Sequence, residues 1–395
     1  MVEQHITYAA RWYNRAGIWI GIGINPASIT LGGGLASHLD LNNLIWLIPI
    51  GVLALAGISM TAGIIGRRRR ETFAKWSSAT FGMGIGAILI NLMMALGMSG
   101  WSGFQVGLGG TGLSNLIFLP GFIGIILMAV IIFSLGSIGI NRWNWFVWLT
   151  TLSSLALAAI ALVIVWQAEP IQLDTEPLTF SRGFWVVGSI ISFASLFSLR
   201  STDFTWDLAS DWDVVFDALA FLCVFSISIS IGVMLYRTTG AWDLAAILDG
   251  TNVAFLGQLF LFLSLLSPAL STMHSGALAW EHVLPVNYRW GTIFIISTGL
   301  VLGLLRFDQQ LLSFLDWLGA ILPPAIAVLI TTALMKEKPS TNWVMGAWIG
   351  GAVVALIFKL NDQLIHLLAG SLVSLIVIYF GQRNQKQPTQ QSSTD

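Results

Sequence analysis

Two side chains in the first half of the chain have the types and the spacing to bind a flat heterocycle. Trp101 and Gln105 are four residues apart, with Gly103 between them. Residues four apart on a helix project from the same face. An indole ring stacks on the face of a planar ligand, and an amide both donates and accepts hydrogen bonds at the ligand's edge. The pair is a candidate binding site; an interfacial aromatic residue with a polar neighbour at a helix end is the alternative.

Ionisable side chains within apolar segments form a second group of candidates, because such groups are rare in membranes and often functional. His274, beside Ser271 and Thr272, lies deepest and is the candidate proton-linked residue; a histidine satisfied within the core is the alternative. The sequence lacks HExxH, GxSxG and P-loop motifs and has no zinc-spaced His and Cys cluster. We therefore expect no enzyme activity, and no cofactor beyond a coupling ion, Na⁺ or H⁺.

The composition places these candidates in a membrane protein. Of 395 residues, 56% are hydrophobic and only 9% are charged, with a mean hydropathy of +0.81. Soluble domains carry about 25% charged residues. The net charge of -1 and the single cysteine, Cys223, point to neither a nucleic-acid partner nor a disulfide framework. The expected partners are the lipid bilayer and a small solute, and no obligate protein partner is evident.

Apolar segments of the length that crosses a bilayer, about 18 to 25 residues, recur along the chain. They predict an all-α protein of twelve transmembrane helices in one domain, residues 1–381, followed by a disordered cytoplasmic tail at 382–395. The predicted spans are 15–38, 43–66, 79–101, 115–140, 145–167, 184–200, 213–236, 253–278, 290–305, 311–335, 342–360 and 363–381.

The distribution of lysine and arginine gives the predicted orientation, because positive loops remain in the cytoplasm. Of the 18 such residues, only Arg182, Arg237, Arg306 and Lys359 fall in the loops of one side. The cluster Arg67 to Arg70 and Arg200, at the end of the sixth predicted span, are among those of the other side. We expect an integral protein of the cell (inner) membrane with both termini in the cytoplasm.

The first span, Arg15 to His38, carries an interruption in its middle. Asn25 and Pro26 break it, since proline lacks an amide proton and disfavours helical geometry at the preceding residue. Backbone groups freed at that depth are tolerated where they are buried in protein or line a polar cavity. Asn25 and Ser28 are therefore candidates for substrate binding, and a simple proline kink is the alternative.

The span count allows two five-helix repeats of inverted topology, at 15–167 and 184–335, followed by two last helices at 342–381. Such repeats place a substrate site at the midplane between two discontinuous helices. The sixth span should then be broken too. Its serines can satisfy freed backbone groups, so we expect this break near Ser192 to Ser195.

Five segments resemble the nucleobase/cation symporter family, in its purine/cytosine permease branch, over about residues 15 to 340. This family has the leucine-transporter-like fold of two inverted five-helix repeats. The segments are Phe81 to Gly107 with its GW.G.Q pattern, Trp185 to Ser192, Ser201 to Phe204, His274 to Trp280, and Phe314 to Ile330 with its paired prolines.

The resemblance implies roles for individual residues. It implies that Trp101 stacks on a nucleobase-like ring and that Gln105 hydrogen-bonds to it. The two unwound helices place Asn25, Ser28 and Ser192 beside the ligand, with Phe193 or Phe197 closing over it. Ser271 of the eighth helix is a further candidate for substrate binding. A weak sodium site is implied at Ile24, Ala27 and Ser267.

The chain also departs from the family pattern. Leu266, Ser267 and Pro268 align with a hydroxyl-rich stretch of the eighth helix, and no asparagine follows. Sodium coupling is therefore open, and proton coupling is the alternative. We expect a cation-coupled symporter that imports a planar heterocycle such as cytosine, a purine or a pyrimidine vitamin precursor by alternating access. The alternative is a transport-inactive relative that acts as a membrane sensor or scaffold.

Overall fold

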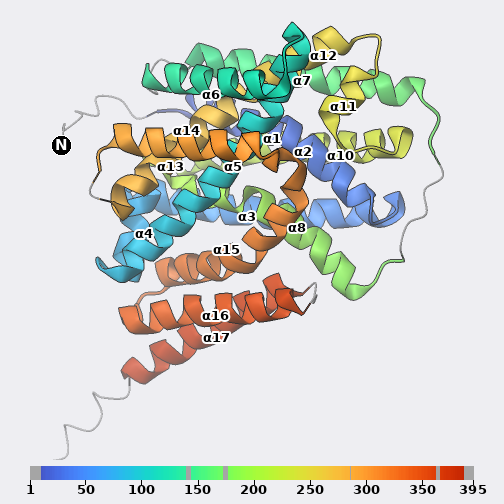
Figure 1. The fold of residues 1–395 in the computed structure, drawn as a ribbon. Coiled ribbons are helices and arrows are strands. Elements are labelled where there is room, and N and C mark those ends of the chain that lie inside the picture. Colours follow the sequence, from blue (N-terminus) through green and yellow to red (C-terminus); the bar gives the residue numbers. More distant parts are fainter. Residues whose placement is uncertain (1–9, 139–143, 172–176, 285, 362–364, 387–395) are drawn as a thin grey trace, which may run out of the picture.

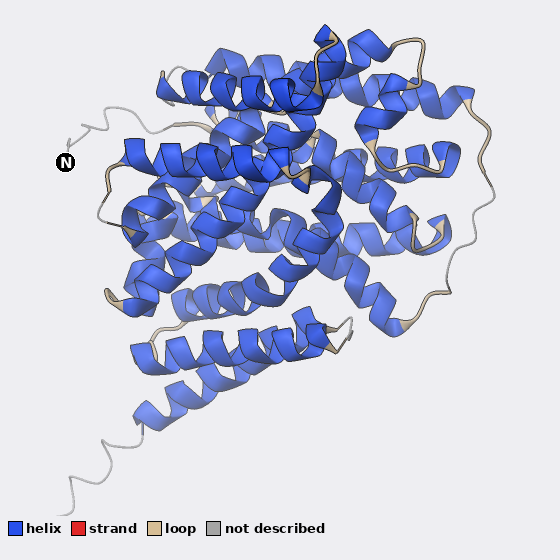
Figure 2. Ribbon diagram, viewed as in Figure 1, coloured by secondary structure: helices blue, strands red, loops and turns tan. Residues whose placement is uncertain are grey.

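The computed structural model describes residues 10–138, 144–171, 177–284, 286–361 and 365–386, and this part of the chain contains helices and connections but no β-strand (Figure 2). Two short 3₁₀ helices, η1 at Trp12–Asn14 and η3 at Phe307–Gln310, accompany the α-helices. The α-helices are α1 Ala16–Gly23, α2 Pro26–Ala36, α3 Leu41–Arg69, α4 Phe73–Phe81, α5 Ile85–Ile117, α6 Gly121–Ser137, α7 Asn144–Gln167, α8 Phe180–Arg200, α9 Thr202–Thr205, α10 Asp211–Thr239, α11 Leu244–Asp249, α12 Ala254–Ser264, α13 Leu266–Val283, α14 Tyr288–Leu304, α15 Leu311–Leu334, α16 Thr341–Leu360 and α17 His366–Lys386.

The helices have the lengths that a polytopic membrane protein needs. Ten helical segments of the described chain are long and apolar enough to cross a bilayer, counting α1 with α2 and α12 with α13 as one each. Two shorter apolar helices, α6 and α14, occupy the positions of the fourth and ninth predicted spans. The all-α class is confirmed, and together these helices match the predicted number of about twelve. The chain is an integral membrane protein.

Several predicted boundaries differ from the structure, most of all that of the third span. The third span is α5, which begins at Ile85 and continues to Ile117, because Gly82, with φ of +87°, ends the separate helix α4. Trp101 therefore stands at the midpoint of a 33-residue helix. At the other end of the chain, α17 continues to Lys386 into the segment predicted as a disordered tail. Residues 387–395 of that tail lie outside the described part.

The break in the first span is confirmed. α1 ends at Gly23 and α2 begins at Pro26, in a stretch where both helices are buried. Asn25 caps α2, because its Oδ1 accepts hydrogen bonds from the Ala27 and Ser28 amides at 2.8 and 3.3 Å. Its Nδ2 donates to the Ile22 carbonyl, and Ser28 Oγ donates to the Gly23 carbonyl at 2.8 Å. Side chains thus replace the lost helical partners.

The predicted break in the sixth span is wrong. α8 is one continuous helix through Ser192 and Ser195. The hydroxyl of Ser195 donates to the Ser192 carbonyl at 2.8 Å, so it supplements the helix instead of replacing lost backbone partners. No proline or glycine lies between Ser189 and Arg200 to remove a backbone hydrogen bond or loosen the helix.

The eighth span carries the second interruption. α12 ends at Ser264, and α13 begins at Leu266. Pro268 explains the position, because a proline ring clashes with the carbonyl four residues earlier, which here belongs to Ser264. The short polar connection between the sixth and seventh spans contains the four-residue helix α9.

The packing surrounds the broken span with long helices. α5 packs against α6, α13 and α14, while α10 packs against α1, α2 and α3, and α8 lies between α3 and α15. α16 and α17 pack on each other and on α15, and they lie together at one edge of the molecule (Figure 1). Asp316 of α15 pairs with Lys359 and lies 3.3 Å from His366 Nε2, which ties this pair to the bundle.

Replacing Asn25 by alanine should destabilise the protein, since loss of an N-cap costs about 0.5–2 kcal/mol. We expect the upper part of this range, because the buried Ile22 carbonyl also loses its donor. The measurement is the Tm of the purified protein in detergent. Asn287→Ala is the matched control, because Asn287 caps α14 at an exposed position where water can replace it. Equal losses of Tm in the two variants would contradict this role for Asn25.

Candidate functional site

A buried cavity, here called the central cavity, lies where the broken first span meets α5, α8 and α13. Its volume is about 40 Å³. The lining residues are Ile22, Asn25, Met98, Trp101, Gln105, Phe193, Ala194, Leu196, Phe197, Arg200, Pro268, Ser271 and Thr272. Both interruptions contribute to it, through Asn25 and Pro268.

Six of the eight side chains predicted to bind substrate line this cavity: Asn25, Trp101, Gln105, Phe193, Phe197 and Ser271. The other two lie elsewhere. The Ser28 hydroxyl donates to the Gly23 carbonyl, which draws it into the helix junction. Ser192 lines a separate small crevice with Asp316 and His366, because the unbroken α8 turns it away from the cavity.

Aromatic rings form one wall of the central cavity. The Trp101 ring meets Phe193 edge to face, with centroids 5.0 Å apart and an interplanar angle of 80°. Phe104 and Phe314 contact Trp101 in the same manner at 5.8 and 5.7 Å. Phe193 in turn stacks on Phe225 at 5.2 Å. Trp101 is 8% exposed, so the alternative of a lipid-interface tryptophan at a helix end is wrong.

Gln105 supplies an amide edge beside this wall. Its Nε2 donates to Thr272 Oγ1 at 3.2 Å, which fixes the side chain against α13. Its Oε1 is buried and has no hydrogen-bond partner. A buried acceptor left unpaired costs free energy that a ligand donor would recover. The pair can therefore offer a ring face and a hydrogen-bond acceptor to one solute.

Arg200 is the main residue that the sequence interpretation missed. It was counted among the cytoplasmic charges at the end of the predicted sixth span, but it is 3% exposed and lines the cavity. One terminal nitrogen donates to the Ser271 carbonyl at 2.8 Å, and the other donates to Ser271 Oγ at 3.0 Å. The guanidinium also lies over the rings of Phe197 and Phe204. The length of the sixth span could have indicated this position. The helix begins at Phe180, so its last residue, Arg200, lies inside the bundle.

The central cavity is tightly closed. A volume of about 40 Å³ is small beside the roughly 300–1,000 Å³ of pockets that bind small molecules. A six-membered ring therefore enters only if aromatic side chains of the wall rotate. Phe193 and Phe197, both on α8, are the rings that separate the cavity from the apolar core around Phe221 and Phe225.

Of the predicted ion-linked residues, Ser267 lies beside the first span. The hydroxyls of Ser267 and Thr151 face Gly21, 3.6 and 3.7 Å from the position of a Cβ at that residue. This is one turn before Ile24, and Ala27 lies beyond the break on α2. His274 is outside the central cavity, and its Nδ1 lies 2.9 Å from the Tyr288 hydroxyl.

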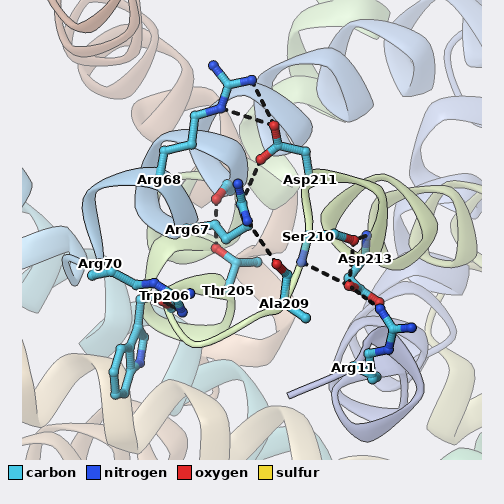
Figure 3. A network of polar contacts seen from close by, with 11 residues as sticks. Arg11, Arg67, Arg68, Arg70, Thr205, Trp206, Ala209, Ser210, Asp211 and Asp213 are labelled. Atoms are coloured by element: carbon cyan, nitrogen blue, oxygen red, sulfur yellow. Dashed lines mark hydrogen bonds and ion pairs between the residues drawn. The ribbon is translucent and has the colours of Figure 1, made fainter. Parts of the chain in front are cut away.

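A polar network joins the first residues of the described chain, the end of α3 and the connection before α10 (Figure 3). Asp211 lies 2.7 Å from both Arg67 and Arg68, and Arg70 donates to the Trp206 carbonyl. Asp207 and Asp213 hold the N-terminal segment, through Arg15 and Arg11 respectively. The Arg67 to Arg70 cluster thus closes this end of the bundle in addition to its expected role in topology.

Replacing Asp207 by asparagine should cost about 1–3 kcal/mol of unfolding free energy, because it leaves the mostly buried Arg15 without its charged partner. Arg68→Gln, at a side chain 65% exposed, should leave the Tm almost unchanged, since exposed ion pairs contribute little. The Tm values of both variants in detergent check this. A larger loss in Arg68→Gln than in Asp207→Asn would contradict it.

Asp203 gives a pH dependence with a defined sign. Burial raises the pKa of Asp203 from 3.8 to about 6, so the folded state holds a proton that the unfolded state releases between these values. Stability should therefore fall as the pH rises through this window. Asp203→Asn keeps an acceptor for the Phe73 amide, which lies 2.8 Å from the carboxylate, and should remove this component from a Tm-against-pH profile. Asp249→Asn, on the exposed end of α11, is the control, and an identical profile in all three proteins would rule the assignment out.

Comparison with known proteins gives the fold. No protein-family model matches the chain, and no curated protein matches it by sequence. Among solved structures, the chain is similar to Mhp1, a nucleobase-cation-symport-1 family transporter, in a closed conformation with bromovinylhydantoin bound. The TM-score is 0.74 and the sequence identity is 17%, over 95% of this chain and 92% of that chain.

Two further structures have the same arrangement. A Na⁺-coupled sialic acid symporter has a TM-score of 0.68 and 12% identity, over 95% of this chain and 90% of its own. A manganese transporter of Eremococcus coleocola has a TM-score of 0.59 and 15% identity, over 94% and 92%. These proteins are transporters, and their likeness to this chain shows its fold. The leucine-transporter-like fold is confirmed, and the chain is similar over nearly its whole length to a nucleobase-cation-symport-1 transporter.

Proposed function

We propose that this protein is a secondary-active transporter that moves a small planar heterocycle across the cell (inner) membrane. Candidate substrates are a nucleobase, such as cytosine or a purine, and a pyrimidine vitamin precursor. The observation that carries the proposal is the convergence of Trp101 and Gln105 on a buried cavity beside the interrupted first span. The fold shared with a hydantoin-bound transporter agrees with a ring-shaped solute.

The chemistry of the cavity favours a planar ligand over a sugar or a metal ion. A planar ring between Trp101 and Phe193 would gain stacking or edge contacts, worth about 0.5–1.5 kcal/mol for each aromatic pair. Gln105 Oε1 would accept a ring N–H. Metal ions need several charged or imidazole ligands, and no group of three or more His, Cys, Asp and Glu residues occurs in the described chain.

The two ends of the bundle differ in their polar contacts, which agrees with alternating access. The ion-pair network closes the end at which α10 begins, and we assign this end to the cytoplasm from the arginines there. At the other end of α10 lies a second cavity of about 370 Å³, lined by Thr30, Phe104, Asp243 and Asp308 among others. A solute bound between the two would shift the populations of the open states by its differential affinity for them.

The coupling cation is Na⁺ or H⁺. The hydroxyls of Ser267 and Thr151 beside Gly21 offer oxygen ligands for Na⁺ next to the break in the first span. The uptake experiment below therefore includes a sodium gradient. His274, which is hydrogen-bonded to Tyr288, is the candidate proton carrier. The experiment therefore also includes a proton gradient. Both ions are therefore varied independently.

Replacing Trp101 by alanine should reduce uptake at least about tenfold, since base–aromatic stacking contributes about 1–3 kcal/mol. The measurement is uptake of radiolabelled nucleobases into proteoliposomes, with imposed sodium or proton gradients. Trp166→Ala is the matched control, because Trp166 is 91% exposed at the end of α7.

Uptake that is the same in Trp101→Ala and the wild type would overturn the site assignment. Ligand-induced thermal stabilisation without gradient-driven accumulation would instead favour the alternative of a sensor or scaffold. The closed cavity and the absence of an asparagine after Ser267 on the eighth span are the observations behind that alternative.

A further inference from the structure

The central cavity contains a buried cation. Arg200 is 3% exposed, and its guanidinium lies among Met98, Ser271 and the rings of Phe197 and Phe204. These neighbours are neutral. A charge held in a low-dielectric interior costs several kcal/mol unless an opposite charge pairs with it. The charge in this cavity therefore favours an anionic partner.

The described residues supply no ion-pair partner for Arg200. Seven ion pairs are formed between described side chains, and none includes it. The charge of Asp203 acts on Arg200, but the two residues form no ion pair, and the Asp203 carboxylate accepts a hydrogen bond from the Phe73 amide. The carboxylates of Asp207, Asp211 and Asp213 pair with other arginines, so they are not available to Arg200.

Two buried polar atoms among the residues that line the cavity have no partner. Arg200 Nε is an unpaired donor, and Gln105 Oε1 is an unpaired acceptor. Both belong to side chains that are 5% exposed or less. A planar ligand with an acidic group toward Arg200 and a ring N–H toward Gln105 would satisfy both atoms. Its ring would then lie near Trp101 and Phe193.

We infer that the substrate of this site is a heterocycle with a carboxylate, or an equally acidic group, that pairs with Arg200. This inference rests on the proposed function and narrows it from planar heterocycles in general to anionic ones. A guanidinium binds a carboxylate through two parallel hydrogen bonds, and such charge-assisted bonds are about twice as strong as neutral ones. Both terminal nitrogens of Arg200 donate to Ser271. The carboxylate of the ligand would replace Ser271 as the acceptor of these hydrogen bonds.

The test compares acids with their uncharged amides on the full-length protein in detergent. The probes are pyridine-3-carboxylate against pyridine-3-carboxamide, and uracil-6-carboxylate against its amide, with Kd measured by calorimetry. We expect the wild type to bind each acid at least about tenfold more tightly than its amide. Arg200→Gln should abolish this preference, and Arg200→Lys should retain part of it because it keeps the charge but loses the fork.

Arg289→Gln is the matched control, because Arg289 is an exposed arginine at the start of α14, and its acid-to-amide ratio should equal that of the wild type. A further arm uses sodium chloride and sodium formate alone. Stabilisation by chloride that depends on Arg200, with no added preference for the heterocyclic acids, would assign the site to a free anion and overturn the inference.

An acid-to-amide ratio near one in the wild type, or a ratio unchanged in Arg200→Gln, would also overturn the inference. If Arg200→Gln does not fold, the wild-type ratio and Arg200→Lys decide the question. The proposed function would still stand after such a result if the neutral amides bind to the wild type and do not bind to Trp101→Ala. Failure of every heterocycle, charged or neutral, to bind would instead contradict the proposed function.

Discussion

The constraint on which this structure depends is that a break in a membrane helix must satisfy its own backbone groups. Apolar surroundings offer no water, so each unpaired N–H or C=O would cost free energy. Asn25 meets this need in both directions, because it accepts from the start of α2 and donates to the end of α1. Ser28 takes the next carbonyl. With the break stabilised in this way, the amide of Asn25 also borders the central cavity.

Proline produces the two interruptions by different routes. Pro26 begins α2, where its missing amide proton is not needed, and the break precedes it. Pro268 lies inside the eighth span and interrupts it one turn earlier, at Ser264 and Leu265. Asn25 and Pro268 line the same cavity, so residues associated with both interruptions meet there. The fold keeps irregular geometry where it is shielded from lipid by α5, α8 and α10.

How much of this could be predicted from the sequence depended on whether a local signal existed. The four-residue spacing of Trp101 and Gln105 and the proline after Asn25 are local, and both led to residues of the cavity. The break in α8 was expected from repeat symmetry, which is not a local signal, and serines do not interrupt a helix when their hydroxyls bond to it. Arg200 was misplaced because counting charges in loops does not show how deep a helix end lies in the bundle.

The position of Arg200 links the charge of the cavity to its shape. Its guanidinium, at the end of α8, donates twice to Ser271 of α13, so a single side chain joins two walls of the cavity. Phe193 and Phe197 belong to the same helix as Arg200 and close the space beside Trp101. A ligand that competes with Ser271 for the guanidinium must therefore act on the contact between α8 and α13. Because α8 also carries the closing rings Phe193 and Phe197, the proposed recognition of an anionic group would act on the same helix contact as opening of the cavity.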